Sequence, residues 1–205
     1  MSSDQTLSEI AKYILKKHPS LFPNFVPRLP ITEQTSIKFE GEFSHKPLSA
    51  GIHSAMMAAL ALQHTLPEWL ISMDGMSGKK YRYFINNLVR QISDPRYFEI
   101  GCWAGSTAAS AIYSNKLSAL CVDNWSQFGG PKEAFMENIA KAKGGGCQFR
   151  FIEDDFRNID YEKLNFDANI YLFDGPHGEQ DQYDGVRLAL PVLQEEFVLI
   201  VDDWN

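Results

Sequence analysis

Residues 97–107 read Tyr-Phe-Glu-Ile-Gly-Cys-Trp-Ala-Gly-Ser-Thr, and this stretch decides the fold class. Its first half is a short apolar run typical of a buried strand, and the small residues that follow predict a helix over 106–114. Gly101 allows a tight turn after the strand, and Gly105 lets the helix begin close to a ligand. The stretch therefore predicts a strand, a turn and a helix, with a ligand at the turn.

The same rhythm of short apolar runs and helical stretches continues to the end of the sequence. Apolar runs predict further strands at 117–123, 147–152, 168–174 and 197–202, and helical spacing predicts helices at 131–143 and 182–193. Because strands that alternate with helices form parallel pairs, we expect residues 95–205 to form an α/β domain with a doubly wound parallel sheet.

Residues 1–94 follow a different pattern, and we expect them to form a mainly helical lid or docking segment. The spacing of apolar residues and the positions of prolines predict, in chain order, a helix at 8–17, a linker at 21–32, a strand at 35–43 and helices at 50–64 and 79–92. A domain boundary is therefore expected near residue 94.

Composition indicates a soluble globular protein with an acidic surface. The 205 residues include 19 Lys and Arg against 26 Asp and Glu, a net charge of −7, which argues against nucleic acid as a partner. Three cysteines without a Cys-x-x-Cys pair favour a reduced, cytoplasmic protein. The N-terminus lacks a signal-peptide pattern, and no apolar run approaches the roughly 20 residues that span a bilayer, so no membrane partner is expected.

Acidic residues follow the predicted strands at the edge where a doubly wound sheet binds its ligands. Asp123 ends the second strand about twenty residues after the glycine turn, a position suited to the two hydroxyls of a ribose. Residues 153–155, Asp174 and the pair at 202–203 follow the next three strands. A single such acid often only caps a helix or lies in a solvated loop, but the whole set predicts a polar ligand site.

The segment from Glu99 to Thr107 resembles the first motif of class I S-adenosylmethionine-dependent methyltransferases. It departs from the dinucleotide-binding pattern, because Trp103 stands where that pattern has its second glycine. The resemblance implies a Rossmann-like class I methyltransferase fold with S-adenosylmethionine as the cofactor.

Three further segments resemble one branch of that family, the metal-dependent O-methyltransferases of small molecules. They are the Asp-Gly-Pro-His at 174–177 with the following Tyr183, the Asp-Asp at 202–203, and residues 75–81, which resemble the stretch before the cofactor domain. The branch includes enzymes that methylate sugars of macrolide and aminocoumarin antibiotics. The resemblance implies methyl transfer to a hydroxyl of a small-molecule acceptor, with a divalent metal assisting.

The resemblance also implies roles for individual residues. Glu99 and Gly101 would line the methionine end of the cofactor, Asp123 would bind the ribose hydroxyls, and Asp155 with Phe156 would lie near the adenine. The full set of implied cofactor contacts is Glu99, Gly101, Gly105, Ser106, Asp123, Asp155, Phe156 and Asp174.

A metal site and a catalytic pair are implied at the last two strands. Asp174, Asp202 and Asp203 would bind a cation, because three converging carboxylates do not all stay ionised without one, and all-oxygen ligation suits Mg²⁺. Pro176 stands where family members often carry a second acid, so His177 and Asp174 form the expected catalytic pair. His177 either accepts a proton or orients a metal-binding carboxylate.

Several residues near the predicted site carry two interpretations. Lys79 and Tyr81 either reach the cofactor carboxylate or close a lid, or they have surface or packing roles. Trp125 either covers the adenine or packs in the core, and Trp204 either walls the acceptor pocket or packs at its rim.

The sequence ends at Asn205, two residues after the last predicted metal ligand, so we expect a C-terminally shortened form of the fold. The strand at 197–201 would then be a bare apolar edge. A second copy of the chain or residues 35–43 are expected to cover it.

Other functions stay open. One is a metal-independent methyltransferase that acts on another acceptor, and another is a non-catalytic binding protein that retains the fold. A domain that binds NAD or a nucleotide sugar is disfavoured by Trp103. A nucleic-acid methyltransferase is disfavoured by the negative charge, although a local basic patch of Lys79, Lys80, Arg82 and Arg90 would be compatible with one.

Overall fold

The computed structural model describes residues 37–41 and 46–203, and the chain divides into two compact units, Met1–Phe43 and Ser44–Asn205. The predicted helix at 8–17 and linker at 21–32 lie outside the described residues. Of the predicted strand at 35–43, residues 37–41 are described and belong to no strand, so the prediction is wrong there. Alternation of apolar and polar residues alone does not determine a strand, because β-propensity depends strongly on context. The domain boundary near residue 94 stays a prediction.

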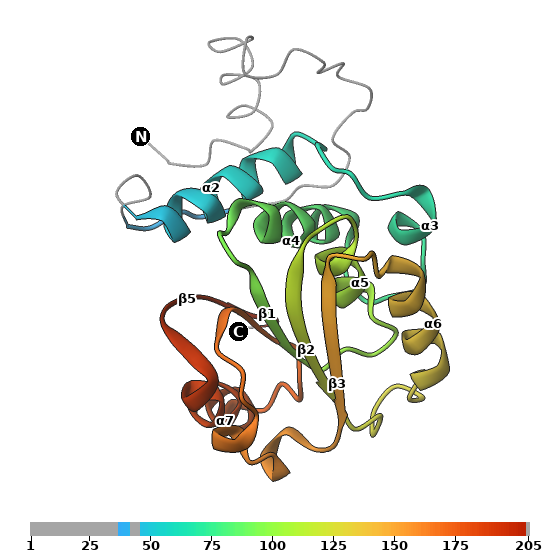
Figure 1. The fold of residues 1–205 in the computed structure, drawn as a ribbon, viewed down its shortest axis with the longest axis vertical. Coiled ribbons are helices and arrows are strands. Elements are labelled where there is room, and N and C mark those ends of the chain that lie inside the picture. The colour runs from blue at the N-terminus through green and yellow to red at the C-terminus, as the bar shows by residue number, and fades with distance from the viewer. Residues whose placement is uncertain (1–36, 42–45, 204–205) are drawn as a thin grey trace. The chain divides into compact units, whose positions relative to one another are not determined.

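Five parallel strands form one sheet in the described part of the chain, in the order β3-β2-β1-β4-β5 (Figure 1). The strands are β1 (Arg96–Ile100), β2 (Leu117–Asp123), β3 (Cys147–Glu153), β4 (Ala168–Phe173) and β5 (Leu193–Val201). The predicted parallel sheet is therefore confirmed. The chain order reverses between β1 and β4, and ligands of doubly wound sheets bind at such a reversal.

Helices cover both faces of this sheet. They are α2 (Pro47–Leu60), α3 (Glu68–Ile71), α4 (Lys79–Gln91), α5 (Ser106–Ile112), α6 (Lys132–Ala142) and α7 (Glu179–Ala189). On β1, Tyr97 faces the hydrophobic core shared with α2, α4, α5 and α6, whereas Phe98 and Ile100 face a second core beneath α7. This alternation follows from the two-residue period of a strand. None of the helices in the described ranges combines the length and hydrophobicity needed to cross a bilayer.

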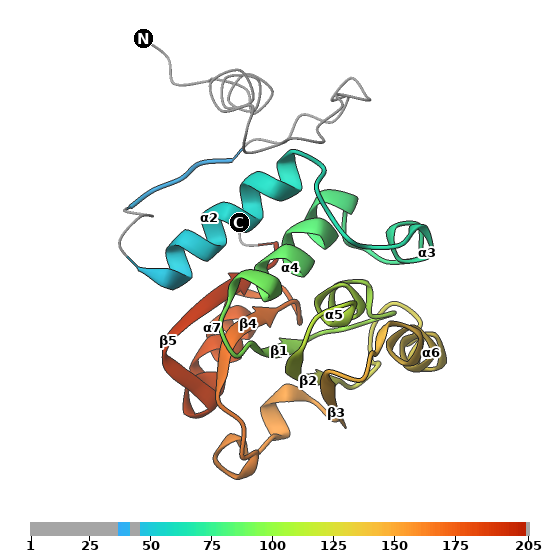
Figure 2. The same ribbon diagram turned by 45° about the horizontal axis from the view of Figure 1, so that its top comes forward.

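The helices that precede the sheet belong to the same hydrophobic core as α5 and α6. Helix α2 begins at Pro47, whose ring suits the first turn, and it packs across α4 (Figure 2). Lys46, which precedes α2, places its Nζ 2.7 Å from Glu196 Oε1 on β5. Helix α4 matches the predicted helix at 79–92, whereas α3 was not predicted, because four residues are too few to show helical spacing. The expected helical character of this segment is confirmed at residues 47–60, 68–71 and 79–91, whereas its role as a lid or docking segment stays a prediction.

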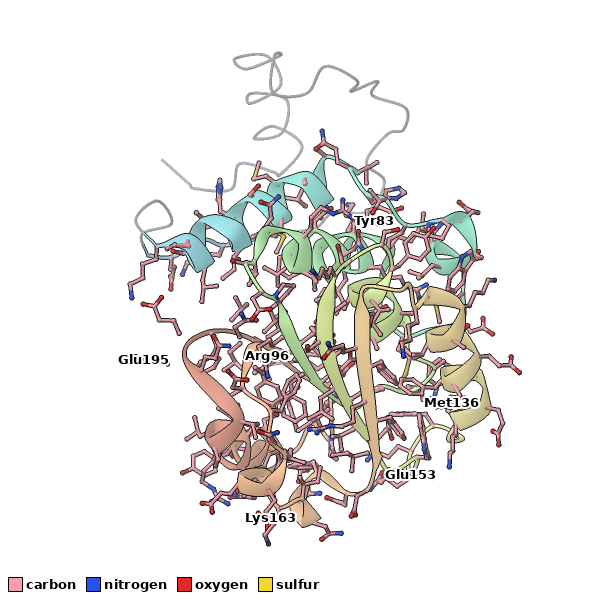
Figure 3. All side chains as sticks on the ribbon, viewed as in Figure 1. Tyr83, Arg96, Met136, Glu153, Lys163 and Glu195 are labelled. Atoms are coloured by element: carbon pink, nitrogen blue, oxygen red, sulfur yellow. The ribbon has the colours of Figure 1, made fainter. Side chains whose placement is uncertain are left out.

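Strand β5 lies at one edge of the described sheet. Glu195, labelled in Figure 3, and Glu196 are exposed on this strand, and Leu199 is 41% exposed. Charged side chains on an edge strand discourage pairing with other chains. A cover over this edge, whether a second copy or another segment, stays a prediction.

Candidate functional site

A cavity of about 620 Å³ opens at the carboxyl ends of the strands. The loops after all five strands contribute to its wall, as expected for the ligand site of a parallel sheet. Glu153, labelled in Figure 3, ends β3 at this edge, paired in register with Asp123 of β2. Seven aspartates line the cavity, namely Asp123, Asp154, Asp155, Asp174, Asp181, Asp202 and Asp203. The cavity wall therefore favours ligands that carry positive charge.

The turn after β1 requires glycine at two positions. Gly101 has a φ of 84°, and a Cβ there would lie 2.0 Å from the carbonyl oxygen of Asp174. Gly105 has a φ of 82°, and a Cβ there would lie 2.8 Å from Cδ2 of Phe135. The missing side chain at Gly101 lets the ends of β1 and β4 approach each other. The missing side chain at Gly105 lets the start of α5 pack against α6. The tight turn predicted at Gly101 is confirmed, and the closeness of Gly105 to a ligand stays a prediction.

Asp123 holds this turn in place. Its Oδ2 accepts hydrogen bonds from the backbone N–H groups of Cys102 at 2.7 Å and Trp103 at 2.9 Å. Its Oδ1 accepts a hydrogen bond from the backbone N–H of Trp125 at 2.8 Å. Carboxylate oxygens have further lone pairs, so Asp123 retains the capacity to accept from a ligand at the cavity wall. Its contact with a ribose stays a prediction.

Glu99 points into the core. It is fully buried, and its carboxylate accepts hydrogen bonds from the Tyr97 hydroxyl and the Thr107 hydroxyl, each at 2.5 Å. Burial raises the pKa of Glu99 to about 7, although both hydrogen bonds act in the opposite direction. Glu99, Gly105 and Ser106 lie outside the described wall of the cavity, so their contact with a cofactor stays a prediction.

The three predicted metal ligands meet His177 at the ends of β4 and β5. His177 Nε2 is 3.5 Å from Asp174 Oδ1, and its Nδ1 is 3.4 Å from Asp203 Oδ2. Burial and the neighbouring Asp202 raise the pKa of Asp174 well above its ordinary value. Burial and Asp203 also raise the pKa of Asp202, while its hydrogen bond with Asp174 lowers it. Of this pair, Asp174 is therefore the residue that holds a proton more strongly.

Helix α7 anchors the end of β5 at this cluster. Gln182 Nε2 donates to the backbone oxygens of Asp202 and Asp203, each at 3.3 Å. The N–H of Asp202 donates to the carbonyl oxygen of Phe173 at 3.0 Å. Gln182 was not predicted as a site residue, since its contacts are with the backbone of a distant loop.

The donor chemistry of the cluster fits a divalent cation, which would offset the repulsion among three carboxylates. Within residues 37–41 and 46–203, however, no three His, Cys, Asp or Glu side chains are arranged to hold a metal ion. His177 instead lies between Asp174 and Asp203. Metal binding stays a prediction, and Asp174, Asp202 and Asp203 are the residues that would hold the ion.

The loop after β3 forms a second polar corner of the cavity. Asp155 caps the short 3₁₀ helix η2 (Phe156–Asn158), because its Oδ1 accepts from the backbone N–H of Arg157 at 2.9 Å. Phe156 is buried, with its ring edge-on to Phe173 at a centroid distance of 5.4 Å. Arg157 and Asp181 also line the cavity and form an ion pair. Neither was predicted, although a basic residue two positions after an Asp cap is a readable signal.

A buried arginine shapes the loop before α4. Arg82 is 3% exposed, and its guanidinium donates to five backbone carbonyls within residues 70–77. The loop rests on the start of α5, where Ser77 Oγ and Ser106 Oγ are 2.7 Å apart. This places Met76, which is 63% exposed, at the cavity wall. Arg82 was expected only as part of a basic surface patch, and its burial corrects that expectation, which rested on charged residues of an amphipathic helix usually being solvated.

Two tryptophans line the cavity. Trp103 donates its indole N–H to the carbonyl oxygen of Phe128 at 3.0 Å. Trp125 packs against Phe135 and Phe151 at centroid distances of 5.3 and 5.6 Å, so it serves the core as well as the wall. Its contact with an adenine stays a prediction.

The other residues for which the sequence left two interpretations open are not among the described residues that line the cavity. Lys79 and Tyr81 do not belong to the described cavity wall. The Tyr81 hydroxyl is buried and has no hydrogen-bond partner among the described residues. Burial raises the pKa of Tyr81, as do the nearby carboxylates of Asp202 and Asp174. Trp204 lies outside the described residues.

A family model described as Methyltransferase domain matches residues 98–204, more than half of the chain. A comparison with curated proteins found no match. Among solved structures, the chain is similar to the SAH-bound methyltransferase PaMTH1 of Podospora anserina, with 20% identity, a TM-score of 0.51, and coverage of 81% of this chain and 73% of that chain. It is also similar to a proposed O-methyltransferase from Klebsiella pneumoniae, with 16% identity, a TM-score of 0.45, and coverage of 94% and 70%. The likeness to PaMTH1 supports a Rossmann-like methyltransferase fold.

Proposed function

The chain belongs to the methyltransferase domain family, and from that premise we propose that it transfers a methyl group from S-adenosylmethionine to a hydroxyl of a small molecule, with a divalent cation assisting. The observation that carries this proposal is one cavity that joins the glycine turn after β1 to the acidic cluster at β4 and β5. The first part suits a nucleoside cofactor, and the second suits proton transfer from an acceptor hydroxyl. That PaMTH1 binds SAH supports the choice of cofactor.

The donor would lie across the ends of β1, β2 and β3. Gly101 lines the cavity at the turn after β1 and would lie at the methionine end of the cofactor. Asp123 would accept from the ribose hydroxyls while it holds the turn, and Asp155 would accept from the purine. The seven aspartates favour the positively charged sulfonium of the donor over its neutral product.

The acceptor would lie at the cluster of Asp174, Asp202, Asp203 and His177. A divalent cation held by the three carboxylates would bind the acceptor oxygens and lower the pKa of the hydroxyl that is methylated. His177 would take the proton of that hydroxyl as the new O–C bond forms and the S–C bond breaks. Positioning of the two reactants dominates such an in-line displacement.

Calorimetric titration of S-adenosylhomocysteine and of Mg²⁺ tests the two parts of this proposal separately. We expect S-adenosylhomocysteine to bind at micromolar concentration, and Asp123→Ala to weaken that binding by tenfold or more. Mg²⁺ should bind to the wild-type protein and not to Asp202→Ala. Asp184→Ala is the matched control, because Asp184 lies on α7, pairs with Arg187 and does not line the cavity.

Each failure in this titration has a distinct meaning. A folded protein that binds no S-adenosylhomocysteine would overturn the methyltransferase proposal. Binding of S-adenosylhomocysteine without binding of Mg²⁺ would support the methyl-transfer part of the proposal and overturn the part that assigns a divalent cation.

A second candidate is a metal-independent methyltransferase. The position of His177 favours it, because the imidazole lies 3.5 Å from Asp174 and 3.4 Å from Asp203, between two of the carboxylates that would otherwise hold the cation. Full turnover of an acceptor in the presence of EDTA would support this candidate over the metal-assisted one.

A further inference from the structure

Arg157 occupies an unusual place in the cavity. It lies on η2, just after the acidic end of β3, and its side chain is 38% exposed. Among the described residues of the cavity wall it is the single lysine or arginine, against seven aspartates. A lone cation in such a setting is strongly held by the carboxylates around it.

Arg157 joins two elements that are distant in the sequence. Its Nη2 pairs with Oδ1 of Asp181 in the first turn of α7, and its Nη1 lies 3.2 and 3.4 Å from the two carboxylate oxygens of Asp155. The guanidinium also lies over the ring of Phe156, with Cζ 4.3 Å from the centroid. These contacts fix the guanidinium on three sides.

The consequence is a fixed carboxylate at Asp155. Its Oδ1 accepts the backbone N–H of Arg157 at 2.9 Å, and its Oδ2 accepts from Asn124 Nδ2 at 3.3 Å. The long contacts of Oδ2 leave that oxygen able to accept another, shorter hydrogen bond. Without the Arg157 side chain, this carboxylate, which is one-third exposed, would keep the backbone hydrogen bond at Oδ1 but only the long contact from Asn124 at Oδ2, so Oδ2 would be held less firmly.

We propose that Arg157 is a positioning residue that sets selectivity for the purine of the cofactor. It holds Asp155, through its anchor on Asp181, so that Oδ2 accepts a hydrogen bond from the 6-amino group. The inference rests on the proposed function, since it takes the bound purine to belong to S-adenosylmethionine. Among the described residues, the Arg157 guanidinium donates to the carboxylates of Asp155 and Asp181, so its effect on the purine would act through Asp155.

The test compares two ligands by calorimetry: S-adenosylhomocysteine and its analogue that lacks the 6-amino group of the purine. The wild-type protein should prefer the first by about tenfold, the value of one hydrogen bond to a charged group. Arg157→Ala and Asp181→Asn should each bring this ratio close to one, mainly by weakening S-adenosylhomocysteine. Arg157→Lys should retain part of the wild-type ratio, because lysine keeps the positive charge but lacks the planar guanidinium that donates to two carboxylates at once.

Arg187→Ala is the matched control, since Arg187 pairs with Asp184 on the same helix as Asp181 and does not line the cavity. It should leave the ratio unchanged. Equal weakening of both ligands in Arg157→Ala would show a merely structural role and overturn the inference, as would a wild-type ratio of one. If the folded wild-type protein binds neither ligand, the proposed function fails and the inference fails with it.

Discussion

Gly101 and Asp174 approach so closely that a Cβ on the glycine would lie 2.0 Å from the carbonyl oxygen of the aspartate. The two strand ends are also joined by a hydrogen bond of 2.8 Å from the N–H of Asp174 to the carbonyl oxygen of Ile100. The cofactor turn after β1 and the acidic cluster after β4 are therefore parts of one rigid contact. A change at the turn is expected to move the acid.

Gly101→Ala tests this contact. The new methyl group would clash with backbone atoms, which cannot move aside by changing rotamer as a side chain can. We therefore expect the free energy of unfolding to fall by about 2–4 kcal/mol. Gly129→Ala is the control, because Gly129 has a similar φ of 81° and nothing within 4 Å of the added Cβ. It should cost only the backbone strain, about 1 kcal/mol. Equal losses in urea unfolding would show that the contact with Asp174 does not matter.

Two tyrosines near the acids should respond oppositely to loss of their hydroxyls. The Tyr81 hydroxyl is buried without a partner among the described residues, so Tyr81→Phe should leave stability unchanged or raise it by up to about 1 kcal/mol. The Tyr97 hydroxyl donates to Glu99, so Tyr97→Phe should cost about 1–3 kcal/mol. Thermal unfolding measures both. A clear loss in Tyr81→Phe would indicate that its hydroxyl has a partner in solution.

Glu99 should make stability fall as pH rises from about 4.5 to 7. Burial raises its pKa in the folded protein from the ordinary 4.5 to about 7, so across that range the folded state holds a proton that the unfolded state has released. Stability therefore decreases with pH, by a total of about 3 kcal/mol for this group. Urea unfolding at pH 4.5 and pH 7.5 measures the decrease. Glu99→Gln should remove that share of it, and an unchanged decrease in the variant would contradict the assignment.

Much of the fold could be predicted, because the information is local. Each strand is a short apolar run, and runs that alternate with helical stretches leave a parallel sheet as the natural arrangement. Boundaries were less well predicted where local signals are weak. Helix α7 begins at Glu179 rather than at 182, because its first turn carries acidic residues and no apolar spacing. Helix α2 begins three residues before the predicted 50, at a proline that suits a first turn.

The site was predicted only where strand ends define it. Asp123, Asp155, Asp174, Asp202 and Asp203 meet at one cavity because parallel strands end at the same edge. The position of Glu99 follows instead from the period of the strand, since residues 97 and 99 share a face and Tyr97 lies in the core.

The structural roles of two arginines were not predicted, for a different reason. The contacts of Arg82 with residues 70–73 and of Arg157 with Asp181 join segments that are separate in the sequence, and no local pattern encodes them.

Arg82→Met tests whether the buried guanidinium holds the loop over α5. Methionine fills a similar volume but leaves five carbonyl oxygens without their donor, so we expect a loss of about 2–4 kcal/mol in unfolding free energy. Arg90→Met on the same helix is the control, because Arg90 is exposed and donates to Thr65. Its loss should stay within about 0.5 kcal/mol. Similar losses of unfolding free energy in the two variants would show that water replaces the guanidinium as the hydrogen-bond donor to these backbone carbonyl oxygens.

A variant of His177 distinguishes a role in proton transfer from a role in positioning the neighbouring carboxylates. If it accepts the proton of the acceptor hydroxyl, His177→Ala should lower kcat by about 100-fold and leave both Mg²⁺ affinity and the Kd for S-adenosylhomocysteine within twofold. If it only orients Asp174 or Asp203, Mg²⁺ affinity should fall together with kcat. His53→Ala is the control, since His53 is exposed on α2 and does not line the cavity. A variant with wild-type kcat and wild-type Mg²⁺ affinity would remove His177 from both roles and leave the carboxylates as the proton acceptors.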